Sequence, residues 1–394
     1  MGLRQSMGLF QTPMALEIGV SASAFGFALA LQNLVWGASQ PFVGMLADRF
    51  GARPTLFGAS LVYALGLLLM GQAQGTLGLN FGGGLLVGLG VAGTGFGVLM
   101  AVVTRAVPEH RRSQMVGAVA AAGSLGTIVL APMAQWMIAT AGWRGAVLVF
   151  AAIAAGMAVL SLAVSTTTAS DVAQADTRGD EALGTVLKQA LTHPGYLAMT
   201  AAFFACGFQL VFITTHLPAF LAYCGIGPSV SASALGVIGL ANAVGTYVIG
   251  LLGGRYSQKR LLALIYLLRT ITIVAWLALP ITPTSTLIFA AAMGLLWLGV
   301  APLVSGIIGR MFGLKYFSTL YGLVFFSHQL GSFAGALLGG IAFDLTGNYV
   351  LAWASLIAIG LLAFALQWPM DDRPPSRRRE GAETVSRAGA ATAA

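Results

Sequence analysis

The chain has 394 residues, of which 57% are hydrophobic and 8% are charged, and its formal net charge is +8. Soluble domains carry about 25% charged residues, so this composition excludes a water-soluble globular protein. The solvent for most of the chain is therefore lipid. Each segment that crosses it must be helical, because backbone groups cannot stay unpaired in hydrocarbon.

Membrane-length apolar segments follow one another along the chain. The first, residues 2–13, is too short to cross a bilayer core of about 30 Å. It aligns with residues 207–218 inside a later span that starts near Tyr196, so we expect a truncated first helix and a native chain that extends upstream. Complete spans are predicted at residues 21–47, 54–73, 77–104, 113–140, 143–165, 196–222, 230–253, 261–280, 284–310, 317–342 and 348–368.

The two halves of the chain repeat each other about 205 residues apart. The recurring pairs are Gly2 and Gly207, Pro13 and Pro218, Arg105 and Arg310, Gly117 and Gly322, and Leu125-Gly126 and Leu330-Gly331. Gly44 and Arg49 recur one residue out of phase as Gly250 and Arg255. Duplication at this period in so apolar a chain predicts an all-α membrane protein of two pseudo-symmetric helical bundles, as in secondary carriers.

We expect an N-terminal helical bundle at residues 1–165, a cytoplasmic linker at 166–194, a C-terminal bundle at 195–368 and a disordered cytoplasmic tail at 369–394. The linker and the tail are polar and mixed in charge. Within the linker, residues 181–192 have helical spacing.

Basic residues indicate the orientation. When the spans alternate, the basic residues of the loops and tail fall on one face, and only Arg144 lies on the other. The positive-inside rule makes the first face, and the C-terminus with it, cytoplasmic. The charges are scattered among loops, so we expect no nucleic-acid site.

The segment GMLADRFGARP, Gly44 to Pro54, joins the second and third spans. It resembles the signature loop of the major facilitator superfamily, Gly-x-Leu-Ala-Asp-Arg-x-Gly-x-Arg. Gly51 permits a tight reversal of the chain. The second copy, residues 250–260, has Gly254 in place of the aspartate, so it lacks this negative charge and we expect weaker ionic contacts there.

In that family the loop works as a latch between the halves. The resemblance therefore assigns a gating role to Gly44, Asp48, Arg49, Gly51 and Arg53, and to Arg255 of the second copy.

Further stretches resemble the bacterial monocarboxylate-porter group, which is akin to the oxalate–formate exchangers. They include GLRQSMGLF at 2–10, RAVPEHRRSQMVGAVAAAGSLG at 105–126 and CGFQLVFITTHLPAFL at 206–221. The resemblance implies a monomeric transporter that moves a small organic anion across the bacterial cytoplasmic (inner) membrane by alternating access, with no cofactor and no enzymatic activity. The mammalian-type members usually place an acid and an arginine together in the eighth span, but residues 230–253 contain no ionisable side chain, so proton coupling and anion exchange both stay open.

Arg4 is the leading candidate for a substrate-binding residue. A guanidinium at membrane depth costs at least about 2.5–3.5 kcal/mol on insertion scales, so it should face a watery cavity. No Asp or Glu lies near mid-depth in any span, so a substrate carboxylate would supply the counter-charge. The alternative is that Arg4 bonds to backbone carbonyls or reaches to the membrane surface.

Other polar residues inside the spans are further candidates. Arg269 either braces neighbouring carbonyls or takes part in binding. His328 and Gln329 are either a proton relay or anion donor, or a neutral pair that bonds between helices. The family places the first, fourth, seventh and tenth helices around the cavity, which adds Gln209, Thr214, Asn33 and Trp297 as candidate lining residues, although each such residue is more often a helix–helix contact.

Three other interpretations remain. A drug or metabolite exporter of the same superfamily is the main alternative, although the fifth span reads GSLGTIVLAPMAQ and lacks the usual exporter motif. A sensor or scaffold is disfavoured because the linker and tail hold no domain. Residues 88–93 spell a dinucleotide fingerprint, but no strand precedes them, so we read these glycines as packing contacts.

Overall fold

The computed structural model describes residues 2–95, 98, 109–164, 183–312 and 317–375. The regular elements of these ranges are helices, as predicted. The elements of the first half are α1 (Gly2–Gln5), η1 (Met7–Phe10), α2 (Gln11–Ile18), α3 (Ala22–Phe50), α4 (Ala52–Gly71), α5 (Thr76–Gly78), η2 (Leu79–Leu86), α6 (Val87–Thr94) and α8 (Glu109–Ser161). Those of the second half are α9 (Leu183–Thr192), α10 (Pro194–Tyr223), α11 (Pro228–Arg255), α12 (Gln258–Leu277), α13 (Pro283–Leu295), α14 (Val300–Phe312), α15 (Phe317–Thr346) and α16 (Val350–Gln367).

Nine helices of the described ranges are long and apolar enough to cross a membrane. They cover the predicted third to twelfth spans, with the fifth and sixth joined in one apolar stretch, Ile128–Ser161. Within α8 the helix is interrupted at Gly142, where φ is 72° and ψ is 169°, between the two predicted spans. α3, the predicted second span, runs for 29 residues.

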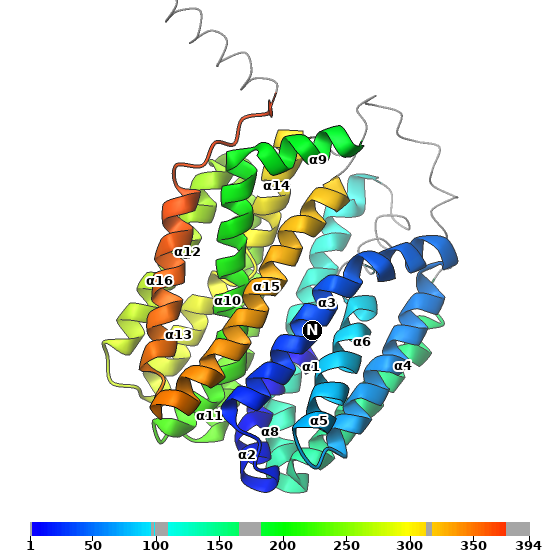
Figure 1. Ribbon diagram of the computed structural model, residues 1–394, viewed down its shortest axis with the longest axis vertical. Coiled ribbons are helices and arrows are strands. Elements are labelled where there is room, and N and C mark those ends of the chain that lie inside the picture. The colour runs from blue at the N-terminus through cyan, green and yellow to red at the C-terminus, as the bar shows by residue number, and fades with distance from the viewer. Residues whose placement is uncertain (1, 96–97, 99–108, 165–182, 313–316, 376–394) are drawn as a thin grey trace, which may run out of the picture.

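The two halves of the chain meet along α3 and α15. Figure 1 shows these two long helices side by side, with the blue-to-cyan helices of the first half on one side and the green-to-orange helices of the second half on the other. Close backbone approach requires glycine here: a Cβ on Gly26 would lie 2.4 Å from the carbonyl oxygen of Ala336, and one on Gly340 would lie 2.3 Å from that of Ala22. Small residues at such a contact are the usual means of packing helices in lipid.

A polar contact closes the same end of this helix pair. The backbone N–H of Ser23, in the first turn of α3, donates to Oδ2 of Asp344 at 2.9 Å. A carboxylate at a helix N-terminus is favoured by the unpaired N–H groups and the helix dipole. α3 and α15 are therefore joined at the end that holds Ala22 and Gly340.

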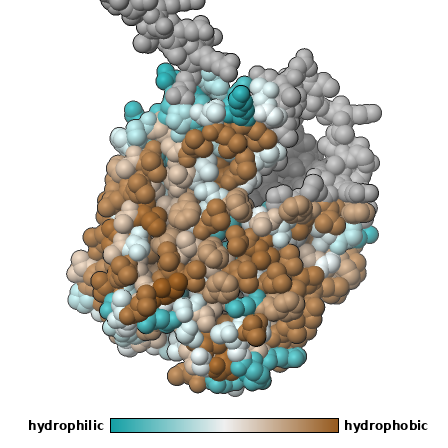
Figure 2. All heavy atoms as spheres, in the orientation of Figure 1, coloured by the Kyte–Doolittle hydropathy of each residue, from teal (hydrophilic) through white to brown (hydrophobic). Residues whose placement is uncertain are grey.

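The surface of the molecule is suited to lipid. Figure 2 shows brown apolar side chains over the middle of the visible face, with teal polar side chains mainly at its two ends. Large apolar side chains such as Val159, Leu160 and Leu362 are 66%, 73% and 58% exposed. Exposure of this kind over a wide area would be unstable in water and is favourable in a bilayer.

Two local predictions can be compared with the backbone. Gly51, between α3 and α4, has φ 91°, so the tight reversal predicted in the signature loop is confirmed. The helical spacing of residues 181–192 corresponds to α9, Leu183–Thr192.

Candidate functional site

Arg4 lies on α1 and has no ionic partner among the described residues. Its Nη1 donates to Oδ1 of Asn33 on α3 at 2.7 Å, and its guanidinium carbon lies 4.9 Å from the ring centroid of Trp36. Its buried Nε has no hydrogen-bond partner. The amide and the indole orient the guanidinium, but neither neutralises its charge.

A cavity of about 150 Å³ adjoins this guanidinium. Its polar lining residues are Arg4, Tyr63 of α4 and Thr94 of α6, and the remaining lining residues are apolar side chains and glycines. α8 contributes Gly123 and Gly126. Among the described residues, the guanidinium of Arg4 is thus the single cation at the edge of a mainly apolar space.

The lining residues of this cavity lie between positions 2 and 157 and so belong to the first half of the chain. Sequence reasoning placed Arg4 here but missed Tyr63, Thr94 and Gly123. A tyrosine or a glycine in an apolar helix normally indicates packing. Neither residue carries a separate signal of a binding site.

A chain of polar contacts leads from Arg4 across the junction of the halves. Nε2 of Gln329 on α15 donates to the backbone oxygen of Asn33 at 3.2 Å, and Nδ1 of His328 lies 3.1 Å from Oε1 of Gln329. The ring of Trp36 packs edge-on against Phe325, with centroids 5.4 Å apart. Asn33, His328 and Gln329 are thus connected to Arg4, although they do not line the cavity.

The same chain continues into the second half. The imidazole of His328 lies beside Cys206 of α10, whose Sγ accepts from Nη1 of Arg269 at 3.3 Å. Phe203 and Phe325 cover the imidazole, with ring centroids 4.9 Å and 5.8 Å away. His328 therefore lies between an amide on one side and a thiol on the other.

Arg269 contacts a break in the predicted tenth span. The helical run stops at the end of α13, Leu295, and resumes as α14 at Val300. Nε and Nη2 of Arg269 donate to the carbonyl oxygen of Leu296 at 3.0 Å and 2.6 Å, and Nη2 also donates to the carbonyl oxygen of Trp297. These carbonyls have lost helical partners, so the guanidinium satisfies them inside the membrane.

The remaining predicted binding residues point elsewhere in the second half. Gln209 donates from Nε2 to the carbonyl oxygen of Leu356 on α16 at 3.3 Å. Thr214 donates to the carbonyl of Leu210 in its own helix at 3.1 Å. Trp297 is 2% exposed. Gln209, Thr214, Trp297 and Arg269 are not among the residues that line the cavity beside Arg4.

The predicted gating residues lie at the ends of helices. The side-chain surroundings of Asp48 and Arg49, and the packing around Gly44, lie outside what the structure describes. Nε of Arg53 donates to the backbone oxygen of Val164 at 2.8 Å. Arg255 is exposed in the last turn of α11.

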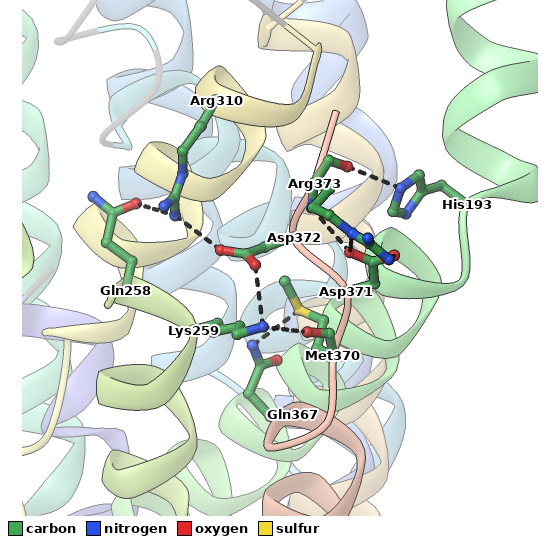
Figure 3. Close-up of polar contacts among 9 residues, drawn as sticks. All are labelled: His193, Gln258, Lys259, Arg310, Gln367, Met370, Asp371, Asp372 and Arg373. Atoms are coloured by element: carbon green, nitrogen blue, oxygen red, sulfur yellow. Dashed lines mark hydrogen bonds and ion pairs between the residues drawn. The ribbon is translucent and has the colours of Figure 1, made fainter. Parts of the chain in front are cut away.

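A polar cluster surrounds the segment that follows α16 (Figure 3). Asp372 lies between Nζ of Lys259 at 3.2 Å and Nη2 of Arg310 at 3.5 Å. Lys259 also donates to the carbonyl oxygen of Met370 at 2.9 Å. A ring nitrogen of His193, which caps α10, lies 3.1 Å from the carbonyl oxygen of Arg373.

The cluster alters the interpretation of the predicted disordered tail. Residues 370–373, which we assigned to that tail, are held against the ends of α10, α12 and α14. Residues 376–394 lie outside the described ranges. The composition of the tail does not predict this contact. Asp372 forms its ion pairs only because the fold brings Lys259 and Arg310 beside it.

We expect the contribution of Asp371 to stability to be lost only in acid. Arg373, which donates to both oxygens of Asp371, holds the pKa of that carboxyl at about 2, below its usual 3.8. The stabilisation is therefore present above pH 3.8 and is lost as the pH falls through 2. Thermal unfolding should show Asp371→Asn to be less stable than wild type at about pH 5, with a difference that disappears as the pH is lowered to about 2. A difference that is the same at both pH values would contradict the assignment.

Comparison with known proteins places the chain in a family. The family model described as Major Facilitator Superfamily matches residues 2–301 and 225–392. Monocarboxylate transporter 13 of Rattus norvegicus is 26% identical over 373 residues, covering 92% of this chain and 83% of that protein. The Oxalate:formate antiporter of Oxalobacter formigenes is 23% identical over 387 residues, covering 95% and 89%.

The fold has a solved counterpart. A crystal structure of a bacterial homologue of the human lysosomal transporter Spinster, in an inward-facing and occupied conformation, superposes with a TM-score of 0.72 at 14% identity and covers 94% of both chains. At that identity the likeness concerns the fold alone. With the family match over both halves, it confirms the predicted fold class: the chain belongs to the Major Facilitator Superfamily and is a multi-pass membrane transporter, not an enzyme.

Proposed function

We propose that this transporter is a secondary carrier of a small organic anion, which binds through a carboxylate to Arg4. The observation that carries the proposal is a buried guanidinium at the edge of an apolar cavity, without a carboxylate partner in the described residues. A substrate carboxylate would complete the charge pair with two charge-assisted hydrogen bonds. The names of the relatives, monocarboxylate transporters and an oxalate:formate antiporter, support the same ligand chemistry.

Different roles follow for the predicted binding residues. In this proposal Arg4 binds the anion, Asn33 orients Arg4, and Gln329 and His328 connect the site to the second half. Arg269 stabilises the break in the tenth span by donating to the carbonyl oxygens of Leu296 and Trp297. The side chains of Gln209 and Thr214 donate to carbonyls of the second half and stay outside the site.

Alternating access is the transport mechanism that we propose. The contact of Ser23 with Asp344 and the close approach of Gly26 and Gly340 join the halves at one end. If the basic loops face the cytoplasm, this joined end is the outer one, and this conformation is closed to the outside. Opening would separate α3 from α15 there, and the signature loop with Gly44, Asp48, Arg49, Gly51 and Arg53, together with Arg255, would act as the latch on the cytoplasmic side.

We propose His328 as the coupling group. Histidine is the side chain whose ordinary titration lies closest to neutral pH. The polar groups that face this imidazole are Gln329 and Ser332 of its own helix and Cys206 of α10, with Arg269 of α12 behind the thiol. Protonation of His328 would thus change its contacts with Gln329, which bonds to Asn33 beside Arg4, and with Cys206 in the second half.

His328→Gln is expected to separate coupling from binding. Uptake by the variant should lose its stimulation by an inward proton gradient, while exchange of internal for external anion continues at a rate within about threefold of wild type. The measurement compares gradient-driven uptake with counterflow in the same proteoliposomes. Gradient stimulation that survives in the variant would leave anion exchange or another group as the driving mechanism.

The function itself is tested with purified protein in liposomes. Radiolabelled acetate or lactate should accumulate in counterflow, and Arg4→Gln liposomes should take up no more label than empty ones. The efflux alternative predicts instead the extrusion of an organic cation or dye. Wild-type protein that moves a dye but no carboxylate would overturn the proposal.

The setting of the protein follows from the same proposal. We place it as a monomer in the bacterial inner membrane, with the C-terminus in the cytoplasm. A fluorescent or enzymatic tag on the C-terminus that is active only in the cytoplasm tests this orientation.

A further inference from the structure

The cavity beside Arg4 has a counterpart in the second half, and that counterpart is filled. Because Leu125-Gly126 recurs as Leu330-Gly331, Gly123 is equivalent to His328. α4 and α12 are both 20 residues long, and their equivalent twelfth positions are Tyr63 and Arg269.

The packing of the two halves is similar but not identical. A Cβ on Gly2 would lie 2.3 Å from the carbonyl oxygen of Gly126, so α1 and α8 are in close contact there. A Cβ on Gly207, the repeat partner of Gly2, would lie 1.9 Å from the carbonyl oxygen of His328, where α10 meets α15. The corresponding helices therefore pack closely in both halves, but the second contact is displaced by three residues, because the repeat partner of Gly126 is Gly331.

The side chains account for the difference. In the second half Cys206 lies beside His328 and accepts a hydrogen bond from Arg269, so polar side chains occupy this place. In the first half the position of His328 is taken by Gly123, which has no side chain. A Cβ built on Gly123 would meet no atom of the described residues within 4 Å, and Gly123 lines the cavity.

We propose that Gly123 determines the size of the substrate, because its missing side chain leaves the cavity into which the acyl chain of an Arg4-bound carboxylate extends. This proposal rests on the proposed function and adds a limit of length. A cavity of about 150 Å³ accommodates benzene, a molecule of six carbon atoms. Monocarboxylates of up to about six non-hydrogen atoms therefore fit, such as acetate, propionate, lactate and butyrate.

The lining also selects against a second charge. Beyond Arg4 the acyl chain would meet Val91, Leu130, Ile153 and Met157. Arg4 is the one cation among the described lining residues, so the distal carboxylate of a dicarboxylate would lie among apolar side chains without a partner there. Burying an unpaired charge is strongly unfavourable.

The test is a chain-length series with Gly123→Ala and Gly123→Val. One methylene more or less in an apolar pocket changes discrimination by about tenfold or more. We expect Gly123→Val to retain formate and acetate uptake within about threefold and to lower kcat/KM for butyrate at least tenfold, with Gly123→Ala between wild type and Gly123→Val. Competition against labelled acetate by each unlabelled acid gives the same order without separate labels.

Gly156→Val is the matched control. Gly156 lies on the same α8, is exposed, has no atom within 4 Å of a built Cβ and does not line the cavity. Its length profile should equal that of wild type. If both valine variants shift the profile alike, or if Gly123→Val lowers uptake of every acid equally, the assignment of Gly123 is wrong.

Two further measurements keep the result decisive. If Gly123→Val fails to fold, thermal stabilisation of wild type by the same acids should rise to about six non-hydrogen atoms and fall beyond that length, and Gly123→Ala should shift the maximum to a shorter acid. A profile that keeps rising in wild type overturns the size limit. Wild type that neither binds nor transports any acid refutes the proposed function instead, so the two failures can be told apart.

Discussion

Replacement of Arg4 by glutamine is expected to weaken carboxylate binding by roughly a hundredfold, which corresponds to about 3 kcal/mol for the loss of two charge-assisted hydrogen bonds. The substrate carboxylate would then enter an apolar cavity whose described lining residues include no cation. Arg4→Lys keeps the charge but loses the planar fork, so it should recover part of the affinity. Equilibrium binding of labelled acid to detergent-solubilised protein measures the effect.

A second variant tests the same site without removing the arginine. Asn33→Asp conserves volume and places a carboxylate where Oδ1 already accepts from Nη1 of Arg4 at 2.7 Å. The internal carboxylate should neutralise the guanidinium and weaken substrate binding at least tenfold. Unchanged binding in both Arg4→Gln and Asn33→Asp would show that the anion binds elsewhere.

Arg269→Gln should lower the stability of the protein by about 2–5 kcal/mol. The guanidinium donates to the carbonyls of Leu296 and Trp297 at the break between α13 and α14, and glutamine cannot reach both. Unsatisfied carbonyls inside a membrane protein cost free energy, so the break would become the weakest point of the second half. Thermal unfolding of the purified protein in detergent measures the loss.

Arg260→Gln is the control for this experiment. It makes the same substitution on the same helix, at an exposed position near the start of α12. Its unfolding temperature should match that of wild type, because exposed charges contribute little to stability. If the Arg269→Gln protein is as stable as Arg260→Gln but cannot bind acid, Arg269 is a substrate-binding residue and not a structural one.

Much of the fold can be predicted from the sequence, because lipid restricts the backbone structures that a spanning segment can adopt. Apolar runs of spanning length must be helices, and the repeat pairs Gly2 with Gly207, which both lie at close contacts between helices. The tight reversal at Gly51 was also predicted, since the signature loop needs a glycine there. The break between Leu295 and Val300 was not predicted, because both sides of it are equally apolar.

The site is harder to predict from the sequence, because it depends on which faces of the helices pack together. The rarity of arginine in a span singled out both Arg4 and Arg269, but only their neighbours separate a guanidinium beside a cavity from one that contacts carbonyls. Gly123 gives no signal alone, since glycines are abundant in this chain. The repeat aligns Gly123 with His328, and this can be seen in the sequence. Only the structure shows that Gly123 lines the cavity beside Arg4.

Locating a bound acid most directly tests whether Arg4 and its cavity form the substrate site. A structure with 3-chloropropionate, whose chlorine can be found by anomalous scattering, should place the carboxylate on the guanidinium of Arg4 and the chlorine among Val91, Ile153 and Met157. A carboxylate bound at Arg269 or His328, or an Arg4 that is paired with a protein carboxylate while the acid lies elsewhere, would contradict it.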